Sequence, residues 1–82
     1  MQTILLDGGR YENAQALHAA LKRLLNLPQY YGMNTDALYD CLTERREPVN
    51  VWVAGMGEGE TAKALTLCLQ AFEDAGSTVR EL

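Results

Sequence analysis

The alternation of strand-like and helix-like segments is the feature that most constrains the fold of this chain of 82 residues. Turn-forming residues at 7–9, 28, 48 and 76 separate segments whose apolar side chains repeat with the period of a strand or of a helix. The order is β-α-α-β-α-β, and strands that alternate with helices indicate a parallel sheet with right-handed crossovers. The sequence therefore predicts a two-layer α/β fold, a single domain over residues 1–82 with a three-stranded parallel sheet packed against helices.

The three predicted strands differ in the strength of their signal. Residues 3–6, Thr-Ile-Leu-Leu, indicate a short buried strand that a turn with two glycines ends. Residues 49–53, Val-Asn-Val-Trp-Val, carry the strongest signal, because β-branched residues occupy alternate positions. Residues 78–82 are expected to form a short final strand.

Three segments have helical periodicity. Asn13 is expected to cap a first helix that Pro28 ends, and Asn34 to cap a second helix over residues 35–44. The apolar stripe of the first helix is Leu17, Leu21, Leu24 and Leu25. A third helix is expected from Thr61 to the glycine at 76. Its apolar stripe is Leu65, Cys68, Leu69 and Phe72. Because both cysteines, Cys41 and Cys68, fall on apolar helix faces, we expect reduced thiols rather than a disulfide.

The predicted second helix has two unlike sides. Its apolar side consists of Ala37, Leu38, Cys41 and Leu42. On the other side Asp36, Asp40 and Glu44 recur every four residues, and no lysine or arginine occurs within residues 24–44. Each pair of like charges at this spacing costs a helix roughly 0.2–0.5 kcal/mol, although the helix dipole favours an acid in the first turn. Three of the four tyrosines lie in the same stretch, Tyr30, Tyr31 and Tyr39. Acids and tyrosines on one side together indicate a protein-binding surface.

Composition limits the class of partner. Eleven acidic and seven basic residues give a formal net charge of −4. This balance argues against a nucleic-acid binder, whose affinity rests on basic groups that contact phosphates, and it suits a basic protein partner. The chain has no apolar run of the roughly 20 residues that a membrane helix needs, and its start lacks the pattern of a secretory signal. We therefore expect a cytoplasmic protein that contacts no membrane.

The most specific segment lies at residues 27–43 and reads Leu-Pro-Gln-Tyr-Tyr-Gly-Met-Asn-Thr-Asp-Ala-Leu-Tyr-Asp-Cys-Leu-Thr. This long ungapped segment resembles the signature of the barstar family of intracellular ribonuclease inhibitors. The similarity covers about the first half of the chain well and continues more loosely through the second strand and the last helix. The resemblance implies a barstar-like fold. It also implies a protein, monomeric when free, that blocks the active site of a small, basic, secreted ribonuclease in a one-to-one complex.

The resemblance further implies which residues touch the nuclease. Asp40 would enter the site that holds the RNA phosphate, and Asp36 would pair with a neighbouring cation. A carboxylate on a rigid helix can accept bidentate arginine bonds as a phosphate does. Asp74 matches a further acidic contact on the family's last helix. The remaining implied contacts are Tyr30, Gly32, Asn34, Tyr39 and Thr43.

Three departures from the family pattern bear on the partner. Position 39 is most often tryptophan in the family, and here it is Tyr39. Arg45 and Arg46 follow the signature where the family can carry an aromatic residue, and a basic pair beside an acidic face would weaken docking on a uniformly basic nuclease. Residues 52–61 form a shorter region than in the family and lack a helix. These departures keep open a second interpretation, a barstar-like interaction module that binds another nuclease or a regulator.

Other kinds of site find less support. The glycine-rich residues 55–60 follow a strand and precede a helix, but a dinucleotide fingerprint would need glycine at Glu60, and acids there repel phosphate. The three acids of the second helix could serve magnesium, yet acids at this spacing are common on solvated helices. His18, the single histidine, is expected at the boundary of the first apolar stripe rather than as a base or ligand. The single serine, Ser77, has no visible partner, so we expect no catalytic residue, no metal and no cofactor.

Overall fold

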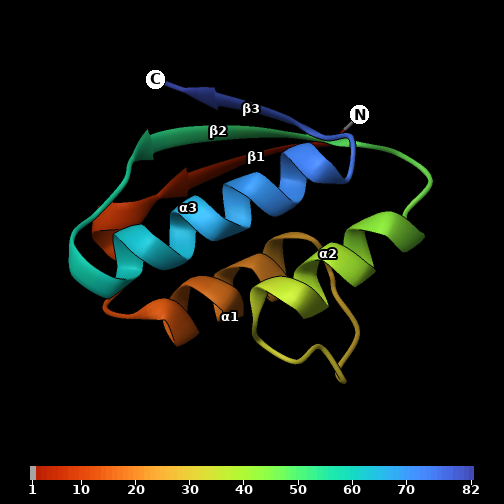
Figure 1. The fold of residues 1–82 in the computed structure, drawn as a ribbon, viewed down its shortest axis with the longest axis horizontal. Helices are drawn as coiled ribbons and strands as arrows, with labels where there is room; N and C mark the ends of the chain where they lie inside the picture. Colours follow the sequence, from red (N-terminus) through yellow and green to blue (C-terminus); the bar gives the residue numbers. More distant parts are fainter. Residues whose placement is uncertain (1) are drawn as a thin grey trace.

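Three parallel strands form one sheet in the computed structural model, which describes residues 2–82 (Figure 1). The strand order is β1-β2-β3, with β1 at Gln2–Asp7, β2 at Val49–Gly55 and β3 at Thr78–Glu81. Each of the three strands lies where the sequence predicts one. The two-layer α/β architecture, with a three-stranded parallel sheet and helices packed against it, is confirmed.

Three α-helices lie on one side of this sheet (Figure 1). They are α1 at Ala14–Leu24, α2 at Thr35–Glu44 and α3 at Gly59–Asp74, and a short 3-10 turn, η1, spans Gly8–Arg10. The Asn13 side chain caps α1 as expected, because its Oδ1 accepts a hydrogen bond from the Ala16 N–H at 2.8 Å. Two of the three helices, α1 and α2, therefore begin at the asparagines that the sequence marks.

The third helix begins earlier than expected. Its first hydrogen bond runs from the Ala62 N–H to the Glu58 carbonyl, so α3 starts two residues before Thr61. As a result β2 leads into α3 through a short loop, without the helix that the family can carry there. Within the described part of the chain, none of the helices has both the length and the apolar character that crossing a membrane requires.

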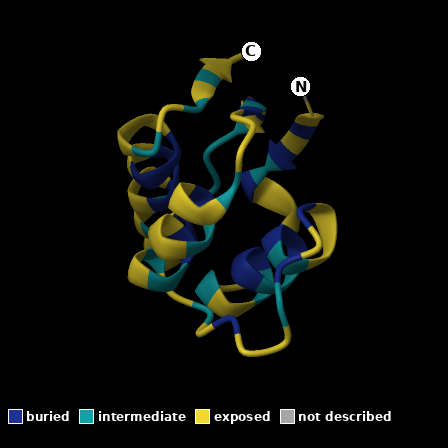
Figure 2. Cartoon of the chain, turned by 90° about the vertical axis from the view of Figure 1, so that its right-hand side faces the viewer, coloured by how far each residue is buried: buried dark blue, intermediate teal, exposed yellow. Residues whose placement is uncertain are grey.

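The sheet has one covered face and one open face. Side chains alternate along the strands, and those that face the helices, such as Leu6 and Val51, are 0% exposed. Leu5 and Trp52 are neighbours in the register, and they stay 55% and 40% exposed on the open face. The prediction that the first strand is buried therefore fails at Leu5, because helices cover only one face. Figure 2 shows the buried residues gathered between the sheet and the helices.

The predicted apolar stripes meet in the interior with one exception. Phe72 of α3 is the largest fully buried side chain and belongs to one cluster with leucines of α1 and α2. Leu24 remains 39% exposed, because α1 ends there and the chain turns at Asn26, whose φ is 52°. Cys68 is buried, Cys41 is half-buried, and both are free thiols as expected.

Candidate functional site

The acidic side of α2 faces outward because its other side is fixed in the core. Leu38 and Leu42 are 0% and 5% exposed, whereas Asp36 and Asp40 are exposed. Burying a leucine side chain contributes about 1.5–3 kcal/mol, so these two residues hold the helix firmly against the interior. The predicted division of α2 into an apolar and an acidic side is thus present in the structure.

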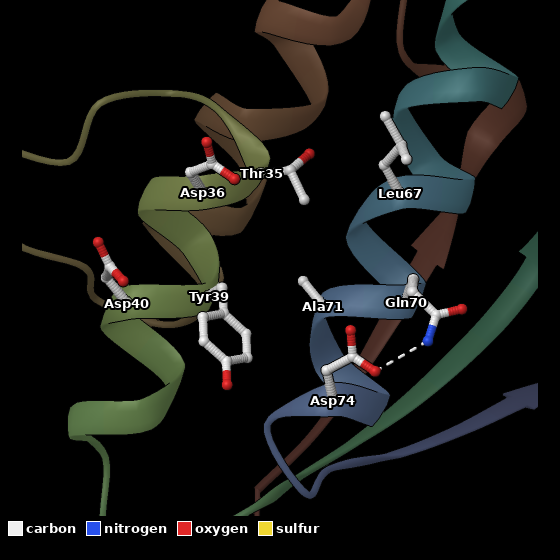
Figure 3. A pocket seen from close by; sticks show the side chains of 8 residues that line it. All are labelled: Thr35, Asp36, Tyr39, Asp40, Leu67, Gln70, Ala71 and Asp74. Atoms are coloured by element: carbon white, nitrogen blue, oxygen red, sulfur yellow. Dashed lines mark hydrogen bonds between the residues drawn. The ribbon is translucent and has the colours of Figure 1, made fainter.

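A groove of about 380 Å³ runs between α2 and α3, and three aspartates line it. Asp36 and Asp40 come from α2, and Asp74 comes from α3, as Figure 3 shows. Tyr39 and Leu67 add apolar surface to the groove, and no lysine or arginine lines it. Half of the predicted site residues therefore line one groove, although they come from two helices.

The carboxylates of α2 affect a neighbouring thiol. Burial raises the pKa of Cys41, and the charges of Glu44 and Asp40 raise it further. A negative field around α2 opposes the formation of a thiolate, just as it favours an approaching cation. The carboxylates of α2 therefore create a negative field that acts on the Cys41 side chain next to them.

The other predicted contacts lie outside the lining of this groove. Tyr30 is 80% exposed in the loop before α2. The Asn34 side chain makes two hydrogen bonds within the protein. Its Nδ2 donates to the Gly32 carbonyl at 3.1 Å, and its Oδ1 caps α2 by accepting a backbone N–H at 2.8 Å. Thr43 Oγ1 donates to the Asp40 carbonyl at 2.9 Å. Of these residues, only Tyr30 offers a large and mostly exposed side chain.

The wall of the groove on α3 was only partly predicted. Leu67, Gln70 and Ala71 line it together with Asp74, and the four residues follow the spacing i, i+3, i+4, i+7 of one helix side. Gln70 Nε2 donates to Asp74 Oδ1 at 2.9 Å, which holds that carboxylate along the helix (dashed line in Figure 3). Leu67 is 56% exposed, away from the buried stripe of α3. This second helical spacing is the signal that could have identified Leu67.

A buried hydrogen bond connects the loop before α2 to the interior. His18 of α1 is 4% exposed, and its Nδ1 lies 2.6 Å from the Tyr31 hydroxyl. Tyr31 stands between Tyr30 and Gly32, and its hydroxyl also donates to the Asn34 carbonyl at 3.5 Å. Burial lowers the pKa of His18, which favours the neutral ring near pH 7. The expected boundary position of His18 is therefore wrong, because Tyr31 satisfies the ring inside the protein.

The third helix joins the same buried cluster. His18 Nε2 lies 3.9 Å from Cys68 Sγ on α3. Burial raises the pKa of the Cys68 thiol to about 11. Because the Tyr31 hydroxyl also contacts the carbonyl of Asn34, this cluster connects α1 and α3 to the residue that caps α2.

The two arginines after the signature have different environments. The Arg45 guanidinium donates to the Leu25 carbonyl at 3.0 Å and to Gln2 Oε1 at 3.1 Å. Arg45 therefore links the end of α2 to the end of α1 and the start of β1. Arg46 is exposed. The basic pair expected beside the acidic face is thus reduced to one exposed arginine, because Arg45 is used within the fold.

The glycine-rich loop after β2 packs closely against the backbone at Gly8. A Cβ on Gly57, whose φ is 76°, would lie 2.6 Å from the Gly8 carbonyl oxygen, so glycine is required for this close approach. The hollow beside these glycines is lined by Glu12 and Glu58, which disfavour a phosphate. Within residues 2–82, no group of three or more histidine, cysteine, aspartate or glutamate side chains is placed to hold a metal ion.

Two comparisons with known proteins bear on this site. The chain is 54% identical over 43 residues to the Bacillus subtilis (strain 168) protein named "Putative ribonuclease inhibitor YrdF". The aligned part covers 52% of this chain and 47% of that protein, so the match spans about half of each. A family model described as "Barstar (barnase inhibitor)" matches residues 1–81. Because that match covers nearly the whole chain, the protein belongs to the barstar family.

Proposed function

We propose that this protein inhibits a small basic ribonuclease by placing the acidic groove between α2 and α3 over its active site. The observation that carries the proposal is that Asp36, Asp40 and Asp74, from two helices, all line one groove, and that none of the described lysines or arginines lines it. Membership of a family described as barnase inhibitors supports it. In this proposal one inhibitor binds one nuclease, needs no cofactor or metal, and catalyses nothing itself.

Asp40 is the residue that we assign to the phosphate site of the nuclease. Its carboxylate is exposed on the outer side of α2, whose inner side is buried. Such a carboxylate accepts two N–H groups of an arginine much as a pair of phosphate oxygens does. Because the helix already fixes the backbone, binding orders little beyond the side chain itself. Asp36 and Asp74 then pair with neighbouring cations of the nuclease.

Aromatic side chains supply the apolar part of the proposed contact. Tyr30 and Tyr39 are 80% and 40% exposed, and tyrosine is a frequent interface anchor because a large rigid ring is buried at little cost in entropy. Gly32, Asn34 and Thr43 flank these residues and complete the proposed contact surface. Steering by the aspartates should make association with a basic nuclease fast and sensitive to salt.

The test is a titration of RNA cleavage by barnase, and by a small panel of related basic ribonucleases, with this protein. We expect activity to fall to zero at one equivalent. Asp40→Ala, and Asp40→Asn as the variant of equal size, should weaken inhibition by about 30-fold or more, because removing one partner of a buried charge pair costs 2–5 kcal/mol. Glu47→Ala, which removes an exposed acid outside the groove, should change inhibition less than threefold.

A barstar-like interaction module with another partner is the second candidate. The exposed Arg46 after α2, and tyrosine at position 39 where the family most often has tryptophan, favour it. This candidate predicts no inhibition of any nuclease in the panel, and it predicts that a true partner carries an acidic patch opposite Arg46. Equal inhibition by Asp40→Ala and Glu47→Ala would instead show that the interface is assigned wrongly.

A further inference from the structure

A second hollow, of about 530 Å³, lies between β1 and α1 and shares no residue with the acidic groove. Arg10 and Arg23 line it, and no carboxylate does. Leu5 and Leu24, which are 55% and 39% exposed, add apolar surface to the hollow. Alanines of α1 also line it. The hollow is therefore basic and apolar, although the net charge of the chain is −4.

The two arginines belong to opposite ends of this hollow. Arg10 follows the carboxyl end of β1. Arg23 lies in the last turn of α1, and Gln2 Nε2 at the start of β1 donates to the neighbouring Leu24 carbonyl at 2.8 Å. In the sheet that the structure describes, β1 is an edge strand: β2 pairs with one side of it, and no described strand pairs with the side toward the hollow. The hollow therefore follows the edge of a strand, with one cation toward each end.

Apolar surface continues from the hollow onto the open face of the sheet. Leu5 lies beside Trp52 in the register, and Trp52 lies beside Arg80 on β3. Trp52 is 40% exposed and Arg80 is exposed. Tryptophan and arginine are the residue types most often found at the energetic centres of protein interfaces. This row therefore enlarges the hollow into a surface of the kind that proteins recognise.

We propose that this surface binds an extended acidic segment of a partner protein along the edge of β1. An apolar side chain of the segment lies against Leu5 and Leu24, and carboxylates on either side of it pair with Arg10 and Arg23. An edge strand offers backbone groups to an added extended chain, and alternate side chains then give specificity. Charge complementarity selects acidic residues, and the overall acidity of the chain disfavours a nucleic acid.

The probe is the capped heptapeptide Glu-Glu-Val-Leu-Val-Glu-Glu, compared with the same peptide carrying glutamine in place of every glutamate. Trp52, the single tryptophan of the chain, is one strand away from Leu5, so its fluorescence reports binding, and calorimetry gives an independent affinity. We expect the glutamate peptide to bind at least tenfold more tightly than the glutamine peptide. The double variant Arg10→Gln/Arg23→Gln should abolish this difference.

Two controls separate this surface from the acidic groove. Arg46→Gln removes an exposed arginine outside the hollow, and Asp40→Ala removes a charge of the groove; both should leave peptide affinity within twofold. Equal binding of the two peptides, no binding by either method at millimolar peptide, or tighter binding of hexauridylate than of the glutamate peptide would each overturn the proposal. None of these outcomes depends on whether the protein inhibits a nuclease.

Discussion

Replacing Arg45 by glutamine tests whether this arginine holds the fold together rather than belonging to the interface. Its hydrogen bond to the Leu25 carbonyl is partly buried, and a bond from a charged donor contributes about 1.5–3 kcal/mol when buried. The bond to Gln2 is exposed and adds at most about 1 kcal/mol. Leu25 closes α1, where the helix dipole also favours a cation. We therefore expect Arg45→Gln to lower the free energy of unfolding by about 2 kcal/mol.

Urea and thermal unfolding measure this loss, with Arg46→Gln as the matched control. For a domain of this size a loss of about 2 kcal/mol lowers Tm by roughly 8–16 °C, whereas replacement of the exposed Arg46 should stay within about 0.5 kcal/mol. Inhibition provides the second readout, because only removal of Arg46 should improve binding to a basic nuclease. Equal stability of the two variants, or improved inhibition by folded Arg45→Gln, would refute the assignment of Arg45 to the fold.

Three further predictions concern His18, Gly57 and Leu67. Because burial lowers the pKa of His18 below its ordinary value of 6.5, its contribution to stability is fully present above about pH 6.5 and is lost as pH falls toward the folded pKa. Urea unfolding from pH 8 to pH 5 should show a slope of at most about 1.4 kcal/mol per pH unit from this group, and His18→Gln should remove it. Gly57→Ala should lower the unfolding free energy by about 1–3 kcal/mol more than Gly59→Ala in thermal unfolding, because both residues have positive φ but only a Cβ at 57 meets the backbone of Gly8. Leu67→Lys should weaken inhibition of a basic nuclease about tenfold without changing stability, because it places a cation beside the aspartates at a 56% exposed position; Leu67→Ala, which adds no charge, serves as its control.

The fold could be predicted wherever local periodicity decides the structure. The acidic and apolar sides of α2 follow from residue spacing alone, and the asparagine caps of α1 and α2 follow from local hydrogen bonding. The open face of the sheet could not be predicted in this way. Leu5 belongs to an apolar run that also fits a strand covered on both faces, and only the placement of all three helices on one side leaves it exposed.

The candidate site could be predicted only where its residues lie on one helix or match a long signature. Asp74 was expected from the resemblance, but its place across the groove from α2 depends on how α2 and α3 pack. The burial of His18 and the contacts of Arg45 escape sequence reasoning for a similar reason. Their partners, the Tyr31 hydroxyl and the Gln2 side chain, lie 13 and 43 residues away in the chain, so no local pattern reveals them.

The acidic side of α2 weakens the helix that carries it, and the packing behind the helix explains why it persists. Two like-charge pairs at i, i+4 spacing cost about 0.4–1 kcal/mol in total. Burial of Leu38 and Leu42 contributes about 3–6 kcal/mol, several times that cost. The bonds of His18 and Asn34 further fix the loop and the first turn, so the backbone that carries the aspartates is ordered before any partner arrives. A basic partner would then relieve the repulsion on α2 without having to order the helix, which lowers the cost of binding.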